Sequence, residues 1–166
     1  MKRLMLLRHA KSDWGNEGLP DFERPLNARG VKDALRMGVE LQQRGDVPEL
    51  LVTSTAVRAL ETVHNVTSAF GEAFESQIEL EPRLYGASSE SIIYHARSLP
   101  DTVSFAMLVG HNPGMEEAVA RLTGQWNPDG MKTCTLASIE FDTDQWQNIA
   151  DGEGTLNWIL YPADLR

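Results

Sequence analysis

Short apolar runs alternate along the chain with longer stretches in which apolar residues recur every three or four positions. Continuous runs are typical of strands buried on both faces. They predict strands at residues 4–7, 50–53 and 103–109, with a weaker one at 77–80. The spacing of three and four predicts amphipathic helices that begin near residues 27, 54, 88 and 113. Alternating strands and helices favour an α/β protein with a largely parallel sheet.

Polar residues and glycines mark the ends of the predicted helices. Asn27 is expected to be the N-cap of the first helix, and Gly45 to end it. Ser54 or Thr55 is expected to cap the second helix, and Ser88 or Ser89 the third. These local signals divide the first two thirds of the chain into strand–helix units.

The C-terminal part of the chain has a different pattern. Apolar and polar residues alternate over 136–141, so that Ser138 and Glu140 are expected to face water, and another strand is expected at 156–161. These two strands are expected to form an antiparallel pair attached to the main sheet. Since no linker or repeat interrupts the chain, the sequence predicts a three-layer α/β/α sandwich in a single domain, residues 1–166.

Composition and charge narrow the classes of partner. The chain has 15 Lys and Arg against 24 Asp and Glu, a formal net charge of −9, which disfavours nucleic acid and anionic membranes as partners. An anionic ligand must therefore be held by a local group of cations. With Cys134 as the only cysteine, a multi-cysteine zinc site is excluded. The apolar runs are too short for a membrane span or a signal peptide, so a cytoplasmic protein is expected.

Histidines and arginines follow three of the predicted strands. The first strand ends in Arg8 and His9, Arg58 lies in the first turn after the second strand, and His111 follows the strand at 103–109. In open α/β sheets, ligands bind beyond the carboxyl ends of the strands. If these strands are parallel neighbours, the four side chains meet in one pocket beside helix N-termini, which favour an anion.

Two histidines among arginines suit phosphoryl transfer. Guanidinium groups match the geometry of phosphoryl oxygens. One neutral imidazole can attack phosphorus and form a phosphohistidine, while nearby arginine charge disfavours its protonation. The second histidine can donate a hydrogen bond to the charge that develops. This arrangement requires no metal ion and no other cofactor.

Three segments carry a resemblance to a known family. In chain order they are Leu7-Arg8-His9-Ala10, Ser54-Thr55-Ala56-Val57-Arg58-Ala59-Leu60-Glu61-Thr62 and Gly110-His111-Asn112-Pro113-Gly114. They resemble the motifs of the histidine phosphatase superfamily, which includes the cofactor-dependent phosphoglycerate mutases and whose fold is called phosphoglycerate mutase-like. Their order and spacing, and the small size of the chain, most resemble the SixA-type phosphohistidine phosphatase branch. That branch also has a segment similar to residues 24–30.

This resemblance implies roles for individual residues. His9 would be the nucleophile of a hydrolase, and Arg8, Arg58 and His111 would complete its phosphate pocket, without a metal ion. The helical pattern alone places Arg58 off the inward face, so a solvated Arg58 is the competing interpretation.

The chain departs from the family pattern at two places. Ala10 replaces the usual glycine after the histidine. The mutase-like branches have a general-acid Glu directly before an Arg-x-Tyr-Gly segment, but here Pro82 precedes Arg83 and Glu81 is one position earlier. Glu81 is therefore the candidate general acid, if it reaches the pocket. Lack of an acid would favour a substrate with a good leaving group, such as phosphohistidine.

The long loop at residues 11–26 is expected to cover the site. Lys11, Asn16 and Arg24 lie in or next to it and are candidates for contacts with phosphate or substrate. Asp13 and Asp21 are interpreted as turn residues.

Three functions fit these residues. The leading hypothesis is a metal-independent phosphatase acting on a phosphorylated substrate, in particular phosphohistidine on a phosphotransfer protein. The first alternative is a small-molecule phosphomonoesterase with the same chemistry, and the second is a catalytically silent phospho-binding module. The short segment between Arg58 and His111 predicts an open pocket, which suits a protein-borne phosphoryl group. The two histidines argue against simple binding, for which Arg and Lys suffice.

Overall fold

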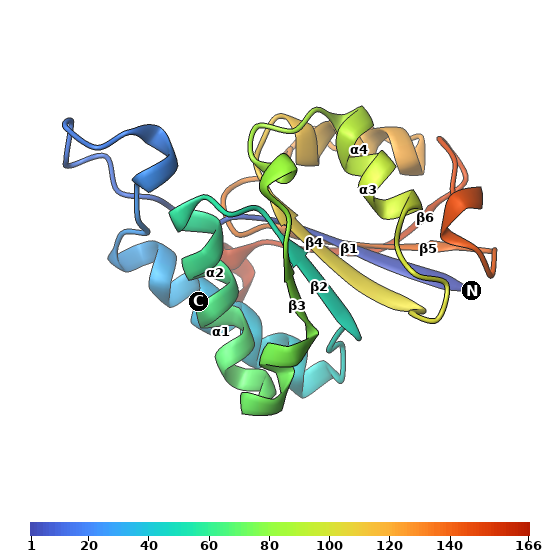
Figure 1. The fold of residues 1–166 in the computed structure, drawn as a ribbon, viewed down its shortest axis with the longest axis horizontal. Coiled ribbons are helices and arrows are strands. Elements are labelled where there is room, and N and C mark those ends of the chain that lie inside the picture. The colour runs from blue at the N-terminus through green and yellow to red at the C-terminus, as the bar shows by residue number, and fades with distance from the viewer.

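A six-stranded sheet in the order β3-β2-β4-β1-β5-β6 runs through the middle of the protein (Figure 1). The computed structural model describes all residues, 1–166. The strands are β1 Lys2–Arg8, β2 Leu50–Thr53, β3 Ile78–Leu80, β4 Phe105–Gly110, β5 Leu136–Phe141 and β6 Thr155–Leu160. The α-helices are α1 Ala28–Arg44, α2 Val57–Thr67, α3 Ser89–Arg97 and α4 Gly114–Thr123.

The sheet combines a parallel part with an antiparallel edge. Strand β4 lies between β1 and β2 and is parallel to both, and β3 is parallel to β2. Strand β5 is antiparallel to β1 on the other side, and β6 is antiparallel to β5. The predicted fold class, a mostly parallel sheet with an antiparallel C-terminal pair, is therefore confirmed.

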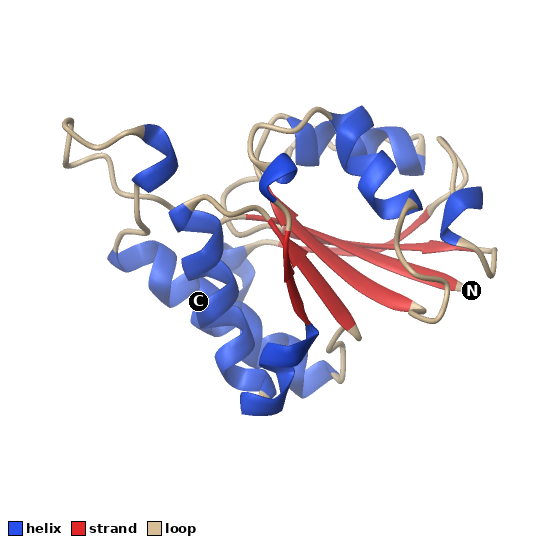
Figure 2. Ribbon diagram, viewed as in Figure 1, coloured by secondary structure: helices blue, strands red, loops and turns tan.

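Helices cover both faces of the sheet, α1 and α2 on one face and α3 and α4 on the other (Figure 2). Each face has its own apolar core. Met37, Leu41 and Val63 belong to one core, and Ile92 and Met115 belong to the other. These cores hold the three layers together, since apolar side chains leave water on each side of the sheet. No helix combines the length and apolar character that crossing a bilayer requires.

Helix α1 begins and ends where the sequence predicts. The Asn27 side chain accepts the Gly30 N–H at 2.8 Å, and Gly45 ends the helix at a φ of 76°, which glycine adopts without strain. Gly30 also packs against the backbone of Lys11, where a Cβ would clash with the Lys11 carbonyl. This close approach fixes the start of α1 against the chain that leaves β1.

Two local predictions are wrong. Ser138, expected to face water, is fully buried, because its face of the sheet is covered: it pairs with Met5 of β1, which belongs to the core on the side of α1 and α2. Its hydroxyl accepts the Arg3 Nε–H at 2.9 Å. Helix α2 has Ala56 as its N-cap and no side-chain cap. The Ser54 side chain, a predicted cap, instead contacts His111 at 2.8 Å. In both cases the serine hydroxyl makes a tertiary hydrogen bond in place of the contact that the local sequence pattern predicts.

Candidate active site

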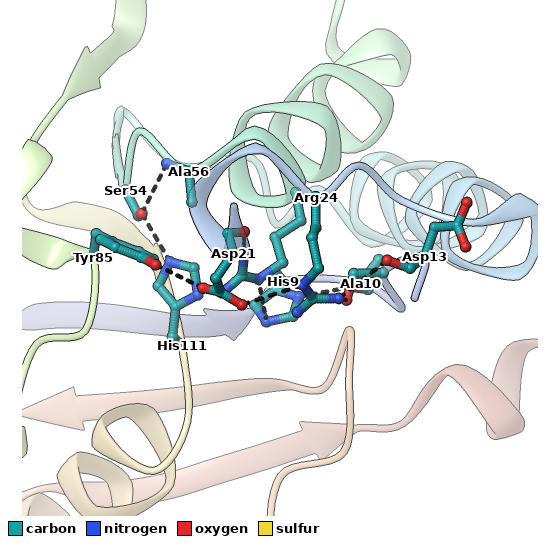
Figure 3. A network of polar contacts seen from close by, with 11 residues as sticks. His9, Ala10, Asp13, Asp21, Arg24, Ser54, Ala56, Tyr85 and His111 are labelled. Carbon is teal, nitrogen blue, oxygen red and sulfur yellow. Dashed lines mark hydrogen bonds and ion pairs between the residues drawn. The ribbon is translucent and has the colours of Figure 1, made fainter. Parts of the chain in front are cut away.

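The two histidines of the predicted pocket lie side by side at the carboxyl edge of the parallel strands (Figure 3). Strands β1 and β4 are direct neighbours, and their register pairs Arg8 with Gly110. The residues that follow, His9 and His111, therefore leave the sheet together, with ring centroids 5.0 Å apart. Parallel pairing thus brings together residues 102 positions apart in the sequence.

The backbone fixes the proton of His9 on one ring nitrogen. His9 Nδ1 lies 2.7 Å from the Ala10 carbonyl oxygen, which can only accept, so Nδ1 carries the proton. Ala10 is held in turn, because its N–H donates to Thr62 Oγ1 at 2.9 Å. The lone pair is left on His9 Nε2, which lies 3.4 Å from Arg58 Nε. This is the tautomer that an attacking imidazole needs.

Ser54 orients His111. The Ser54 hydroxyl oxygen accepts the Ala56 N–H at 3.2 Å and lies 2.8 Å from His111 Nε2. We assign its proton to the bond with His111 Nε2, which places the imidazole proton on Nδ1. His111 Nδ1 is buried and has no hydrogen-bond partner in the protein, so it is a donor free to bind a ligand.

Arg8 supplies a second unpartnered donor. Its Nη1 donates to the Met131 carbonyl at 2.9 Å, while its Nε is buried without a partner. Buried polar groups in proteins are nearly always hydrogen-bonded. Arg8 Nε and His111 Nδ1 are therefore two buried donors, at the ends of the neighbouring strands β1 and β4, that are left for a ligand acceptor.

Arg58 completes the group and is buried, with 6% of its surface exposed. The competing expectation of a solvated Arg58 is therefore wrong: Arg58, Ala59 and Thr62 are buried, whereas Val57 and Leu60 are only partly buried. The face of α2 is set by what it packs against, and at its first turn that is the polar site. Arg58 Nη1 donates to the Asp21 carbonyl at 2.7 Å, and Nη2 to Asp21 Oδ2 at 2.9 Å.

Asp21 and Tyr85 belong to the site and were missed in the sequence. Asp21 opens a short 3-10 helix in the loop, Asp21–Glu23, and Tyr85 Oη donates to Asp21 Oδ2 at 2.6 Å. The Tyr85 hydrogen bond, followed by those from Arg58 and Arg24, holds the pKa of Asp21 well below its usual range. Asp21 is thus an ionised carboxylate beside Arg58. A lone Asp in a loop carries no sequence signal for this position.

Burial keeps both histidines neutral. It is the main cause that lowers the pKa of His9 to about 3 and that of His111 to about 4. The charges of Arg58 and Arg8 lower both further, as the sequence suggests, but their effect is smaller than that of burial. His9 and His111 are therefore unprotonated at neutral pH.

The loop residues predicted to contact substrate lie at different places. Arg24 is buried and joins the network through Asp21 Oδ1 at 3.2 Å and Ser12 Oγ at 2.7 Å. Asn16 is exposed, and its side chain accepts the Gly18 N–H within its own turn. Lys11 lines a neighbouring cleft of about 700 Å³, together with Arg29 and other residues, but without His9.

Glu81 has its own partner. Its carboxylate accepts hydrogen bonds from Arg83 Nη2 at 2.7 Å and from the Arg83 backbone N–H at 3.0 Å. These bonds lower the pKa of Glu81 and keep it ionised. A carboxylate held in this way has no proton to donate.

The pair of histidines is less open than the short segment between Arg58 and His111 suggests. His9 and His111 each expose only 6% of their surface. The cover comes from the loop at residues 11–26, in which Asp21 reaches Arg58 and the Phe22 ring packs on Tyr85 with centroids 5.0 Å apart.

Comparison with known sequences shows the family. Residues 4–92 match the sequence profile of the histidine phosphatase superfamily, branch 1. An uncharacterized chloroplastic protein of Arabidopsis thaliana is 32% identical over 167 residues, covering 96% of this chain and 75% of the other. The chain therefore belongs to the histidine phosphatase superfamily and is a phosphatase, so its substrate is a phosphorylated compound.

Several similar proteins have the name SixA. A phosphohistidine phosphatase SixA homolog of Haemophilus influenzae is 29% identical over 147 residues, which cover 84% of this chain and 88% of that one. A crystal structure of a candidate phosphohistidine phosphatase SixA from Agrobacterium tumefaciens has a TM-score of 0.84 at 30% identity, covering 97% and 98% of the two chains. The protein histidine phosphatase SixA complexed with tungstate has the same fold, with a TM-score of 0.83 at 23% identity over 99% of both chains.

Proposed function

We propose that this phosphatase works through a covalent phosphohistidine on His9, and that its substrate is a phosphohistidine carried by a protein. The observation that carries the proposal is the state of His9: its proton is held on Nδ1 by the Ala10 carbonyl, and its Nε2 lone pair faces the guanidinium of Arg58. A neutral imidazole with a fixed tautomer, placed beside cations, is an activated nucleophile for a phosphoryl group.

The first step transfers the phosphoryl group to the enzyme. The lone pair of His9 Nε2 forms a bond to phosphorus while the bond from phosphorus to the leaving nitrogen breaks. A substrate imidazole that keeps a proton on its other nitrogen leaves as a neutral ring, so the enzyme need not supply a proton. This agrees with the pairing of Glu81 to Arg83, which leaves that carboxylate ionised.

The second step returns the enzyme to its starting state. Because His9 Nδ1 keeps its proton, the phosphorylated ring is cationic and is a good leaving group. A water molecule attacks phosphorus, the bond between phosphorus and Nε2 breaks, and dihydrogen phosphate leaves with both protons of the water. His9 is again neutral, with its lone pair on Nε2.

Three other residues stabilise the transferring group. Arg8 Nε and His111 Nδ1 are buried donors without partners, and phosphoryl oxygens would satisfy both. Arg58 adds a guanidinium beside His9 Nε2. Donors that are already in place where charge develops lower the barrier without the cost of reorganisation.

The names of similar proteins also support the substrate class. The Haemophilus influenzae relative is named as a phosphohistidine phosphatase homolog, and the structure with a TM-score of 0.84 is described as a candidate phosphohistidine phosphatase. The labile bond between nitrogen and phosphorus in such a substrate fits a site in which no carboxyl group is placed as a protonated acid.

The test compares the hydrolysis of two substrates, a phosphohistidine-bearing protein domain and an aryl phosphate, in the presence of a chelator. The expected result is strong preference for the phosphohistidine and, after an acid-free quench, an acid-labile phosphoryl group on the enzyme. His9→Ala is expected to lower turnover by more than about 10³-fold and to abolish the labelled enzyme. His95→Ala, a histidine outside the site, is the matched control and is expected to retain both.

Other results would point elsewhere. Equal or better turnover of the aryl phosphate would favour the small-molecule phosphomonoesterase. Substantial turnover by His9→Ala protein would exclude His9 as the nucleophile. Phosphate binding by the wild-type protein without turnover of either substrate would indicate a binding module.

A further inference from the structure

The carboxylate of Asp21 is hydrogen-bonded to the guanidinium of Arg58, the group that the proposed function assigns to the phosphoryl group of the substrate. The Asp21 carboxylate accepts from Arg58 Nη2 at 2.9 Å, from Tyr85 Oη at 2.6 Å and from Arg24 Nε at 3.2 Å. Figure 3 shows this carboxylate between the two histidine rings and Arg24. The acidic residue is therefore part of a positively charged site, although the proposed reaction gives it no task.

We propose that the Asp21 carboxylate is a built-in competitor of the phosphoryl group, which holds Arg58 in the free enzyme, is displaced by substrate and returns to Arg58 as inorganic phosphate leaves. This proposal rests on the proposed function, because it takes Arg58 as a phosphate ligand. As a consequence, anions bind the site less tightly than they would if Asp21 did not hold Arg58. Every anion that binds Arg58 Nη2 must first replace an anion of the protein itself.

The site favours a phosphoryl group in this exchange. Arg8 Nε and His111 Nδ1 remain buried and unpartnered while Asp21 holds Arg58. A tetrahedral phosphoryl group with three oxygens can accept from both donors as well as from Arg58, which the Asp21 carboxylate does not do. A bound phosphoryl group therefore accepts more hydrogen bonds from these cationic and histidine donors than the Asp21 carboxylate that it displaces.

The surroundings of Asp21 allow the side chain to move without unfolding the loop. Half of its side-chain surface is exposed, compared with 7% for Arg58. The loop backbone is held by contacts that do not involve the carboxylate: Arg58 Nη1 binds the Asp21 carbonyl oxygen, Arg24 binds Ser12, and Phe22 packs on Tyr85. Rotation of one side chain toward water is enough to free Arg58 Nη2.

Because these contacts hold the loop without the Asp21 carboxylate, a substitution that changes only this carboxylate tests the proposal. Asp21→Asn removes the negative charge but keeps the size of the side chain and the backbone contact with Arg58. Asp13→Asn is the matched control in the same loop, because the Asp13 carboxylate accepts only the Gly15 N–H, at 2.7 Å, and has no contact with Arg58. Both variants change the net charge equally, so a general effect of charge appears in both.

The experiment measures the dissociation constant of inorganic phosphate by calorimetric titration at constant pH and ionic strength. Asp21→Asn is expected to bind phosphate about two- to fivefold more tightly than the wild-type protein, a range set by the modest strength of an ion pair with a half-exposed partner. Asp13→Asn is expected to bind as the wild type does. Inhibition of turnover by product phosphate is expected to strengthen by the same factor in Asp21→Asn alone.

Unchanged or weaker phosphate binding by Asp21→Asn would overturn the proposal, since it would mean that Asp21 only positions Arg58. An equal gain in Asp13→Asn would overturn it as well, because the effect would then be one of net charge. Phosphate binding by the Arg58→Ala variant distinguishes a failure of the competitor proposal from a failure of the proposed function. If Arg58→Ala weakens phosphate binding while Asp21→Asn does not tighten it, only the competitor is excluded; if Arg58→Ala has no effect, the phosphate site itself is wrong.

Discussion

Two clusters of this protein combine histidine, arginine and a carboxylate but have different properties. One joins His9 and His111 with Arg58 and Asp21, and the other joins His95 with Arg83 and Glu81, with His95 Nδ1 3.8 Å from Glu81 Oε1. In the first cluster Arg58 exposes 7% of its side chain, whereas in the second Arg83 exposes 72%. In the first cluster the buried His111 Nδ1 has no partner, whereas in the second the charges of Arg83 and Glu81 are paired with each other.

The difference comes from how each cluster is assembled. Glu81 and Arg83 are two residues apart, so their pairing is decided by local geometry at the surface. His9 and His111 come from neighbouring strands and Arg58 from a helix start, so tertiary packing buries them together. Burial, more than residue type, is the main cause that lowers the pKa values of His9 and His111, and it strengthens the electrostatic interactions within the first cluster.

Substitution of the arginine in each cluster is expected to give the largest difference between the two clusters. Arg58→Ala is expected to reduce kcat/KM by about 10²–10³-fold, or about 3–4 kcal/mol of transition-state stabilisation, the typical loss when one preorganised donor is removed. Arg83→Ala is expected to leave kcat/KM within about twofold, since an exposed ion pair contributes little. Steady-state kinetics on the phosphohistidine protein measure both. An equal loss in the two variants would remove the distinction between the clusters.

The pH dependence of stability is expected to separate the buried His9 from His95. Because the pKa of His9 is about 3 in the folded protein and near 6.5 when unfolded, the unfolded chain binds the proton first, and stability falls as the pH drops below 6.5. Between pH 7 and pH 5 this costs about 1–2 kcal/mol. His9→Ala is expected to remove that loss, as measured by denaturant unfolding at both pH values.

The same measurement on His95→Ala provides the comparison. Burial also lowers the pKa of His95, but the Glu81 carboxylate opposes this effect. A smaller change in pH dependence is therefore expected than for His9→Ala. A larger change would contradict the ranking of the two clusters by burial.

The smallest effect is expected at Glu81. Glu81→Gln keeps the shape of the side chain and is expected to leave turnover of both phosphohistidine and aryl phosphate within about twofold, because the paired carboxylate is not a proton donor. Loss of a general acid would instead lower turnover by about 10²-fold or more. Comparison of the two substrates in this variant detects such a loss, which would appear first with the poorer leaving group.

Much of the fold can be predicted from the chain because its signals are local. Apolar runs of strand length, the Asn27 cap and the glycine at position 45 each act over a few residues, and all appear where expected. Ser138 shows where this reasoning fails. Its exposure depends on whether its face of the sheet is covered, and the helices α1 and α2, which come much earlier in the chain, cover that face.

The sequence by itself determined which groups could meet: Arg8 and His9 at the end of one strand, Arg58 at the start of a helix and His111 at the end of another strand. Only the tertiary structure decided what each group does there. Register placed the two imidazoles 5.0 Å apart, packing buried Arg58 against the expectation from helical periodicity, and the loop brought Asp21 onto its guanidinium. Strand and helix positions follow from short-range patterns, whereas burial, tautomer and ion pairing depend on neighbours that are distant in sequence.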